Sequence, residues 1–114
     1  MICALVIDHI DPLAPFFAEL RRVRRTDGYV VVSVVHPAMM LKGVQARFRD
    51  PATGREVRPE SVAHELSDYV MAALRAGATI CELSEHRVDE ALAASVPRAA
   101  RYLGWPLLFM MKFR

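Results

Sequence analysis

Residues 1–35, MICALVIDHIDPLAPFFAELRRVRRTDGYVVVSVV, hold two apolar stretches on either side of an amphipathic segment. The first stretch, Ile2–Ile7, has no charge and no alternation, which is typical of a strand buried on both faces. Asp11-Pro12 is typical of a helix start, and apolar residues then recur every three or four positions as far as Val23. Tyr29–Val35 is rich in valine and predicts a second strand. Strand, helix and strand in this order predict a right-handed, parallel βαβ unit.

The rest of the chain continues the alternation of helices and strands. Residues 38–59 are polar and rich in turn formers, and we interpret them as an insertion or lid-like excursion from the sheet. A helix is predicted to begin after Ser61 and to end at Gly77. Short helical turns, interrupted by Pro97, lie between two further predicted strands, Thr79–Leu83 and Pro106–Phe113. Because nothing divides the composition, we expect residues 1–114 to form a single domain.

Composition narrows the range of functions. The chain is 54% hydrophobic with a formal net charge of +2, a balance that does not favour nucleic-acid binding. No apolar stretch reaches the roughly 20 residues of a membrane-spanning helix, so no membrane partner is expected. Cys3 and Cys81 both lie in apolar stretches, where a thiol usually packs as a small hydrophobe. We therefore expect a reduced, cytoplasmic protein.

The segments MICALVIDHIDPLAPFFAELRRVRRTDGYVVVSVVHPAMM, SDYVMAALRAGATICEL and PLLFMMKFR together resemble the second half of class I S-adenosylmethionine-dependent methyltransferases. The resemblance implies that Ile2–Ile7 and Tyr29–Val35 correspond to strands four and five of that family. Thr79–Leu83 then corresponds to strand six and Pro106–Phe113 to strand seven. The implied fold is a partial, Rossmann-like α/β sheet of about four strands, in the order 4-5-7-6. Its last strand is antiparallel, and helices lie on both faces.

The cofactor half of that family has no counterpart in the chain. The family binds S-adenosylmethionine with a glycine-rich loop after its first strand and an acidic residue after its second. The chain has 5 glycines, at positions 28, 43, 54, 77 and 104, which are too far apart to form such a loop. The resemblance therefore implies that the first three strands are not encoded here. We expect no cofactor on the isolated chain, and S-adenosylmethionine once a partner completes the sheet.

Three polar residues follow the first two predicted strands. Asp8 and His9 come after the first and His36 after the second, and open parallel sheets bind ligands at these carboxyl ends. The resemblance makes the three residues candidate substrate contacts, with His36 or His9 as a candidate general base. The alternative is that they are only strand ends and turn formers. His64 and His86 lack the spacing of metal ligands, so no metal site is expected.

These observations predict a methyltransferase-like half domain that is inactive alone. Ile2–Ile7, an interior strand in the family, would be an unpaired apolar edge, and such edges invite pairing. We expect this edge to bind a complementing chain or a second copy, forming a homodimer. The alternatives are a non-catalytic remnant or interaction module, and a fragment of a longer methyltransferase. The methyl acceptor is not indicated by the sequence, although residues 38–59 are the place to look for its pocket.

Overall fold

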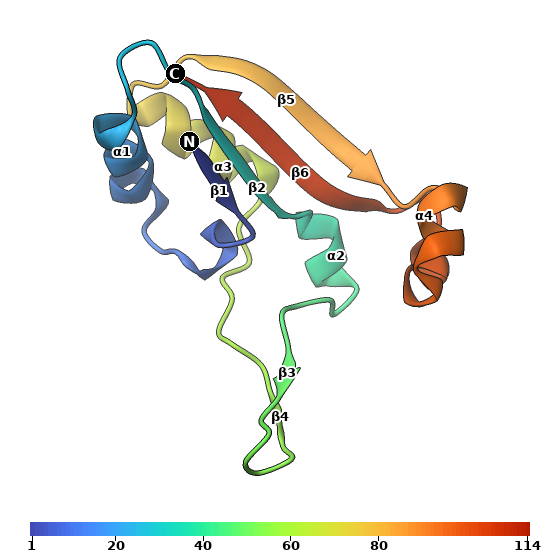
Figure 1. Cartoon of the computed structure of the whole chain (residues 1–114). Helices are drawn as coiled ribbons and strands as arrows, with labels where there is room; N and C mark the ends of the chain where they lie inside the picture. Colours follow the sequence, from blue (N-terminus) through green and yellow to red (C-terminus); the bar gives the residue numbers. More distant parts are fainter.

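The computed structural model describes all 114 residues and contains one four-stranded sheet (Figure 1). Its strands lie in the order β1-β2-β6-β5. The parallel pair is β1 and β2, and β6 runs antiparallel to both of its neighbours. The predicted strand order and the antiparallel last strand are therefore confirmed. The bounds are Ile2–Ala4 for β1, Val30–Val35 for β2, Ile80–Arg87 for β5 and Pro106–Phe113 for β6.

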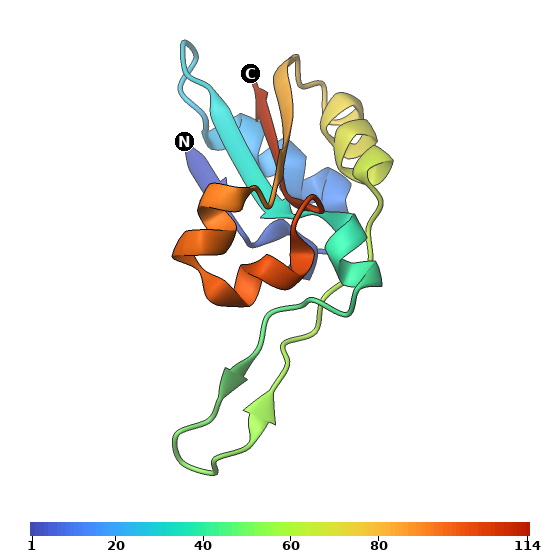
Figure 2. The ribbon, with the colours of Figure 1, turned by 90° about the vertical axis from the view of Figure 1, so that its right-hand side faces the viewer.

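The helices are shared unevenly between the two faces of the sheet. Helices α1 (Leu13–Val23) and α3 (Leu66–Arg75) pack side by side against one face. Helix α4 (Glu90–Ser95) and the 3-10 helix η2 (Pro97–Tyr102) lie beyond the end of the sheet, toward the opposite side (Figure 2). The short helix α2 (Pro37–Leu41) follows β2 directly. None of these helices is long and apolar enough to cross a membrane.

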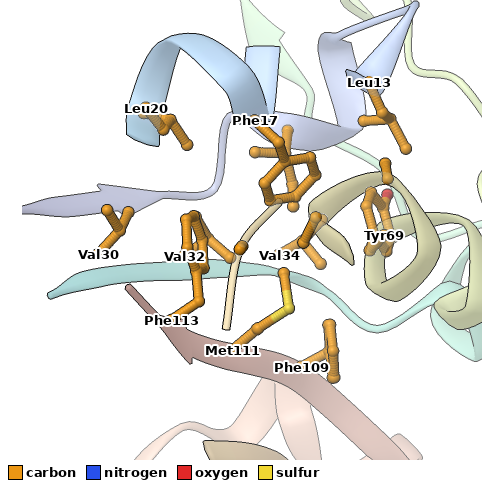
Figure 3. Packing of buried hydrophobic residues seen from close by; sticks show 14 residues of the cluster. Leu13, Phe17, Leu20, Val30, Val32, Val34, Tyr69, Phe109, Met111 and Phe113 are labelled. Carbon is orange, nitrogen blue, oxygen red and sulfur yellow. The ribbon is translucent and has the colours of Figure 1, made fainter. Parts of the chain in front are cut away.

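One hydrophobic core lies between the sheet and the pair α1 and α3 (Figure 3). Every second residue of β2 and β6 points into it, as the period of a strand requires. Residues three or four positions apart on each helix complete it, and the ring of Phe17 packs edge-on against that of Phe113 at 5.7 Å. The main contributors are Leu13, Phe17, Leu20, Val30, Val32, Val34, Tyr69, Phe109, Met111 and Phe113.

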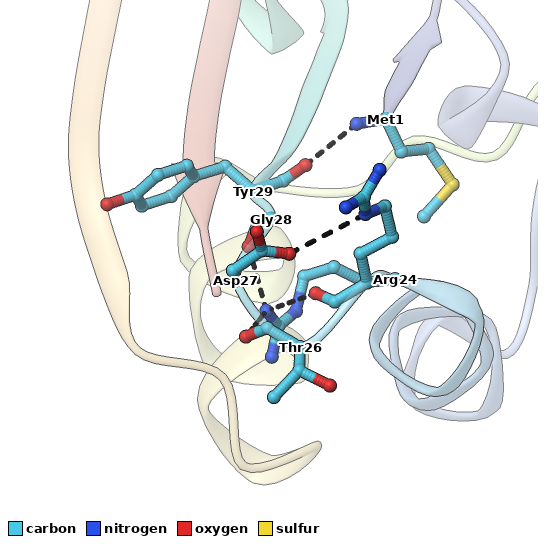
Figure 4. Close-up of polar contacts among 7 residues, drawn as sticks. Met1, Arg24, Thr26, Asp27, Gly28 and Tyr29 are labelled. Atoms are coloured by element: carbon cyan, nitrogen blue, oxygen red, sulfur yellow. Dashed lines mark hydrogen bonds and ion pairs between the residues drawn. The ribbon is translucent and has the colours of Figure 1, made fainter.

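The turn between α1 and β2 is held by one arginine (Figure 4). Nη1 of Arg24 donates hydrogen bonds to the carbonyl oxygens of Arg25, Thr26 and Gly28 at 2.8, 2.9 and 2.7 Å. The amino nitrogen of Met1 donates to the carbonyl oxygen of Tyr29 at 2.8 Å, which fixes the start of β1 beside β2. Arg24, directly after α1, therefore orders the backbone of this turn.

Three predicted boundaries were wrong. Strand β1 ends at Ala4, because Leu5 takes a left-handed φ of 54° and Ile7–His9 forms the 3-10 turn η1. Strand β5 continues to Arg87, well past the predicted Leu83, because β6 pairs with it along most of its length. Helix α3 is capped by Glu65 rather than by Ser61.

The predicted excursion, residues 38–59, contains most of α2 and a small hairpin. Strands β3 (Phe48–Arg49) and β4 (Glu56–Val57) pair with each other and project away from the body of the molecule (Figures 1 and 2). At the hairpin tip, Asp50 accepts hydrogen bonds from the Thr53 hydroxyl at 2.7 Å and from the Ala52 N–H at 2.9 Å. These bonds, the one from Thr53 foremost, hold the pKa of the Asp50 carboxyl below its usual value.

Candidate functional site

The carboxyl ends of β1 and β2 place the predicted site residues on one rim of the sheet. After β1, the left-handed Leu5 redirects the chain into η1, and the fully buried Ile7 anchors that turn in the core. Asp8 is thereby drawn inward until only 6% of the residue is exposed. Its Oδ1 is buried and has no hydrogen-bond partner. A buried carboxylate oxygen without a partner in the protein is rare, and Asp8 is therefore free to accept a hydrogen bond from a water or another group.

His9 is held in one orientation beside Asp8. Its Nδ1 lies 2.6 Å from the carbonyl oxygen of Glu60, and because a carbonyl can only accept, Nδ1 carries the proton and donates. The lone pair of the neutral ring is therefore on Nε2, which lies 3.8 Å from Oδ2 of Asp8. A ring nitrogen whose lone pair is not used within the protein can accept a proton from a ligand.

His36 is buried and uses both ring nitrogens within the protein. It caps α2, with Nδ1 accepting the Ala38 N–H at 3.1 Å. The ring proton is therefore on Nε2, which donates to Oε1 of Glu85 on β5 at 2.6 Å. A histidine with both nitrogens engaged is suited to positioning α2 against β5. Of the two candidate bases, His9 is the one with a ring nitrogen that forms no hydrogen bond within the protein.

Two further residues, His64 and Tyr69, lie close to these positions. Nε2 of His64 donates to the carbonyl oxygen of Ile10 at 2.8 Å, and its ring packs edge-on against Tyr69 at 5.4 Å. Burial, with a smaller effect from Asp8 and then Asp68, raises the pKa of Tyr69 to about 12. The phenol is therefore neutral near the site at physiological pH. Nothing local in the sequence marks His64, because its partners are more than fifty positions away or on another element.

The structure brings together some of the predicted residues and separates others. Asp8 and His9 are in contact, whereas His36 makes no hydrogen bond or ion pair with either of them. His36 and His64 instead line a shared pocket of about 220 Å³ between α2 and the start of α3. No group of three histidine, cysteine, aspartate or glutamate side chains lies close enough to hold a metal ion.

The glycines do not form a cradle for S-adenosylmethionine. Four of them, Gly43, Gly54, Gly77 and Gly104, occupy isolated turns with positive φ. Gly28 lies in the turn before β2, at the amino end of a strand and away from the carboxyl rim. A cofactor loop needs closely spaced glycines between the carboxyl end of a strand and a helix. The residues of this chain do not fit the cofactor by themselves.

Comparison with solved structures defines the class of fold. The chain is similar to an S-adenosylmethionine-dependent methyltransferase from Mesorhizobium loti, with a TM-score of 0.72 and 18% identity, covering 99% of this chain and 60% of that one. A protein of Listeria monocytogenes, provisionally described as such a methyltransferase, gives a TM-score of 0.64 and 14% identity over 98% of this chain and 58% of its own. The fold is therefore part of a methyltransferase sheet, as the sequence predicted.

A sequence comparison also matches the chain to a methyltransferase. The chain is 39% identical, over 106 residues, to an uncharacterized methyltransferase from Emericella nidulans. The match covers 88% of this chain and 36% of that protein, so the chain spans about a third of the relative's length. No family model matches the chain. The resemblance to methyltransferases is confirmed by fold and by sequence, and the chain is methyltransferase-like.

Proposed function

We propose that this chain forms the acceptor-binding side of an S-adenosylmethionine-dependent methyltransferase and becomes active when a cofactor-binding half pairs with β1. That half is either a separate polypeptide or a preceding segment of a longer form of the same polypeptide. The similarity to methyltransferases in fold and sequence supports the reaction class. The separated glycines support the need for a second half.

The observation that carries the proposal is the unpaired edge of β1. This strand forms backbone hydrogen bonds with β2 alone, so its outer N–H and C=O groups are free to pair with another strand. Ile2 is 79% exposed, and the neighbouring Met1, Leu5 and Val6 are also exposed. An uncharged, apolar strand edge of this kind favours the addition of another strand.

A second copy of the chain is the other candidate for this edge. Two copies pairing through β1 would form one continuous sheet with two-fold symmetry. Such a homodimer brings the same separated glycines twice and supplies no cofactor loop. We therefore propose the homodimer as the form of the chain when the cofactor half is missing, and the completed sheet as the functional form.

Sedimentation equilibrium tests whether two copies of the chain pair through β1. The chain alone is expected to be a dimer, and Ile2→Lys is expected to shift it to a monomer by placing a charge on the pairing edge. Leu41→Lys is the matched control, because Leu41 is 89% exposed but lies on α2, away from β1. A monomer at all concentrations, or equal effects of the two substitutions, would refute the pairing of two copies through β1.

Calorimetry with S-adenosylmethionine tests whether cofactor binding requires a second half. The chain alone is expected to give no binding heat. A mixture with the part of the Emericella nidulans relative outside the matched 106 residues is expected to bind one equivalent. Stoichiometric binding by the chain alone would contradict the proposal. A complex that forms through β1 but binds no cofactor would favour the interaction module.

His9 is the residue that we propose as proton acceptor for the methyl acceptor, with Asp8 stabilising its charged form. In the completed enzyme, His9→Gln is expected to lower kcat by about a hundred-fold or more while KM changes little, because proton transfer occurs in the transition state. His36→Asn is the matched control, since asparagine also caps helices well and keeps α2 in place. Equal losses of kcat in both variants would argue against a proton-transfer role for His9.

A further inference from the structure

A second, larger cleft lies beside the candidate site. It has a volume of about 590 Å³ and separates α2 and the Gly43–Arg47 segment from α4 and η2. This volume is within the range of about 300 to 1,000 Å³ that is usual for small-molecule pockets. Its apolar lining comes from both sides and from the sheet: Met39, Val44, Leu92, Val96, Ala99, Tyr102 and Leu107.

The charged residues of this cleft are all cations. Lys42, Arg47, Arg98 and Arg101 line it, and no aspartate or glutamate does, although the chain holds 13 acidic residues. Four positive charges around one apolar hollow create a local positive potential that the net charge of +2 does not reveal.

These cations remain largely available to a ligand. Arg98 lines the cleft, and its side chain makes no hydrogen bond or ion pair within the protein. Arg47 has a single ion pair, to Glu56, at 4.0 Å. The ammonium of Lys42 lies over the ring of Trp105 at 4.0 Å, and the guanidinium of Arg101 lies over its neighbour Tyr102 at 4.7 Å. Contacts with aromatic faces orient both cations and leave their N–H groups able to donate to an anion.

The cleft lies on the same rim of the sheet as the candidate site. Leu107 belongs to the start of β6, which pairs with the carboxyl end of β2 through Val35 and Leu108. Met39 lines the cleft from α2, the helix that His36 caps. A ligand in the cleft would therefore lie where open parallel sheets bind their substrates.

We propose that this cleft binds a small organic anion with an apolar body and a carboxylate group, and that this anion is the substrate class of the methyltransferase. The apolar floor takes the body of the ligand, and Arg98 and Arg101 donate to the carboxylate from η2. The binding itself stands on the geometry of the cleft, whereas the identity of the ligand as methyl acceptor rests on the proposed function.

Binding to the isolated chain tests the proposal with 3-phenylpropionate as the probe. Titration followed by NMR is expected to move the amide signals of Leu92 and Val96. The neutral isostere 3-phenylpropionamide is expected to bind at least about ten-fold more weakly, because it lacks the charge. Inorganic phosphate, which has charge but no apolar body, is expected to leave those signals unmoved. Equal binding of the acid and the amide, or binding of phosphate alone, would overturn the proposal.

Double variants distinguish specific binding in the cleft from a general effect of the protein's positive charge. Arg98→Gln with Arg101→Gln is expected to weaken 3-phenylpropionate binding at least about ten-fold. Arg25→Gln with Arg75→Gln removes the same charge away from the cleft and is expected to leave the affinity unchanged. Arg98→Lys with Arg101→Lys keeps the charge and is expected to retain most of the binding, which guards against misfolding as the cause. Equal losses in the first two pairs would overturn the proposal.

These titrations need neither cofactor nor methyl transfer. If the probe fails to bind, the proposed reaction class still stands on its own evidence. If the probe binds but the completed sheet binds no S-adenosylmethionine, the cleft remains a carboxylate site and the proposed function fails.

Discussion

At the scale of single residues, the rim of the sheet is shaped by backbone strain and by a buried side-chain oxygen without a hydrogen-bond partner. Leu5 has a left-handed φ of 54°, a conformation that is costly for a residue with a branched side chain. The strained residue turns the chain so that Asp8 is buried with a free carboxylate oxygen. Strain of this kind is often found next to functional sites, where it places a side chain that regular structure would not.

Leu5→Gly is expected to stabilise the isolated chain by about 0.5 to 1 kcal/mol, because glycine adopts this φ without strain. The Leu5 side chain is 53% exposed, so little packing is lost. Urea unfolding measures the change. Leu41→Gly is the control: it places glycine in α2 at an exposed leucine and is expected to lower stability. Destabilisation of similar size at both positions would show that Leu5 is not strained.

Tyr69 predicts an alkaline loss of stability. Its pKa is about 12 in the folded protein and about 10 in an unfolded chain, so the neutral phenol stabilises the fold below pH 10. That contribution is lost as the pH rises from about 10 through 12, because the unfolded state then releases the proton more readily. Urea unfolding is expected to show a smaller alkaline decline in Tyr69→Phe, and an unchanged one in Tyr29→Phe, whose ring is exposed.

At the scale of elements, most of the helices and strands could be predicted from the sequence, because the spacing of apolar residues is clear in them. Pro106–Phe113 was predicted with its observed bounds, and its alternate residues fill the core. The error at β1 arose because a short apolar run does not distinguish a strand from a buried 3-10 turn. The error at β5 arose because its second half is polar and exposed, and only its pairing with β6 identifies it as a strand.

The candidate site was less predictable than the fold. Residues at strand ends, such as Asp8 and His36, can be found by their position in the chain. Their partners cannot be found in this way, because Glu85 and Glu60 approach from about fifty residues away. Which histidine has a free lone pair depends on these distant hydrogen bonds, so the sequence alone does not distinguish His36 from His9.

The β3–β4 hairpin is the element least supported by the rest of the molecule. It pairs only with itself, and its residues are almost all exposed. Brief trypsin digestion is therefore expected to cleave first after Arg49 or Arg55, with the fragments identified by mass spectrometry. Arg24 is expected to resist, because its guanidinium is held in the α1–β2 turn. First cleavage after Arg24 would contradict this ordering of local stability.

At the scale of the whole molecule, the chain has a small core for its composition. Only 20 of 114 residues are buried, although 54% of the chain is hydrophobic. The radius of gyration is 15.6 Å, against about 13 Å for a compact chain of this length. The projecting hairpin and the thin sheet account for the excess, and apolar surface remains on the outside.

Stability is therefore expected to depend on association. If two copies pair through β1, mass action makes the Tm rise with protein concentration. Differential scanning calorimetry over a range of concentrations measures this rise. Ile2→Lys is expected to abolish the concentration dependence, whereas Leu41→Lys is expected to retain it. A Tm independent of concentration in the unmodified chain would show that association contributes nothing to stability.

The two borders of the sheet differ in a way that limits its growth. The outer border at β5 carries Glu82, Glu85 and Arg87, charges that discourage a further strand. The border at β1 carries none. A sheet with one edge that can pair and one edge that repels further strands can add only one partner, either a second copy of the chain or a different strand. If strands are added through β1, we therefore expect assembly to stop at a pair, which is a finite particle rather than a fibre.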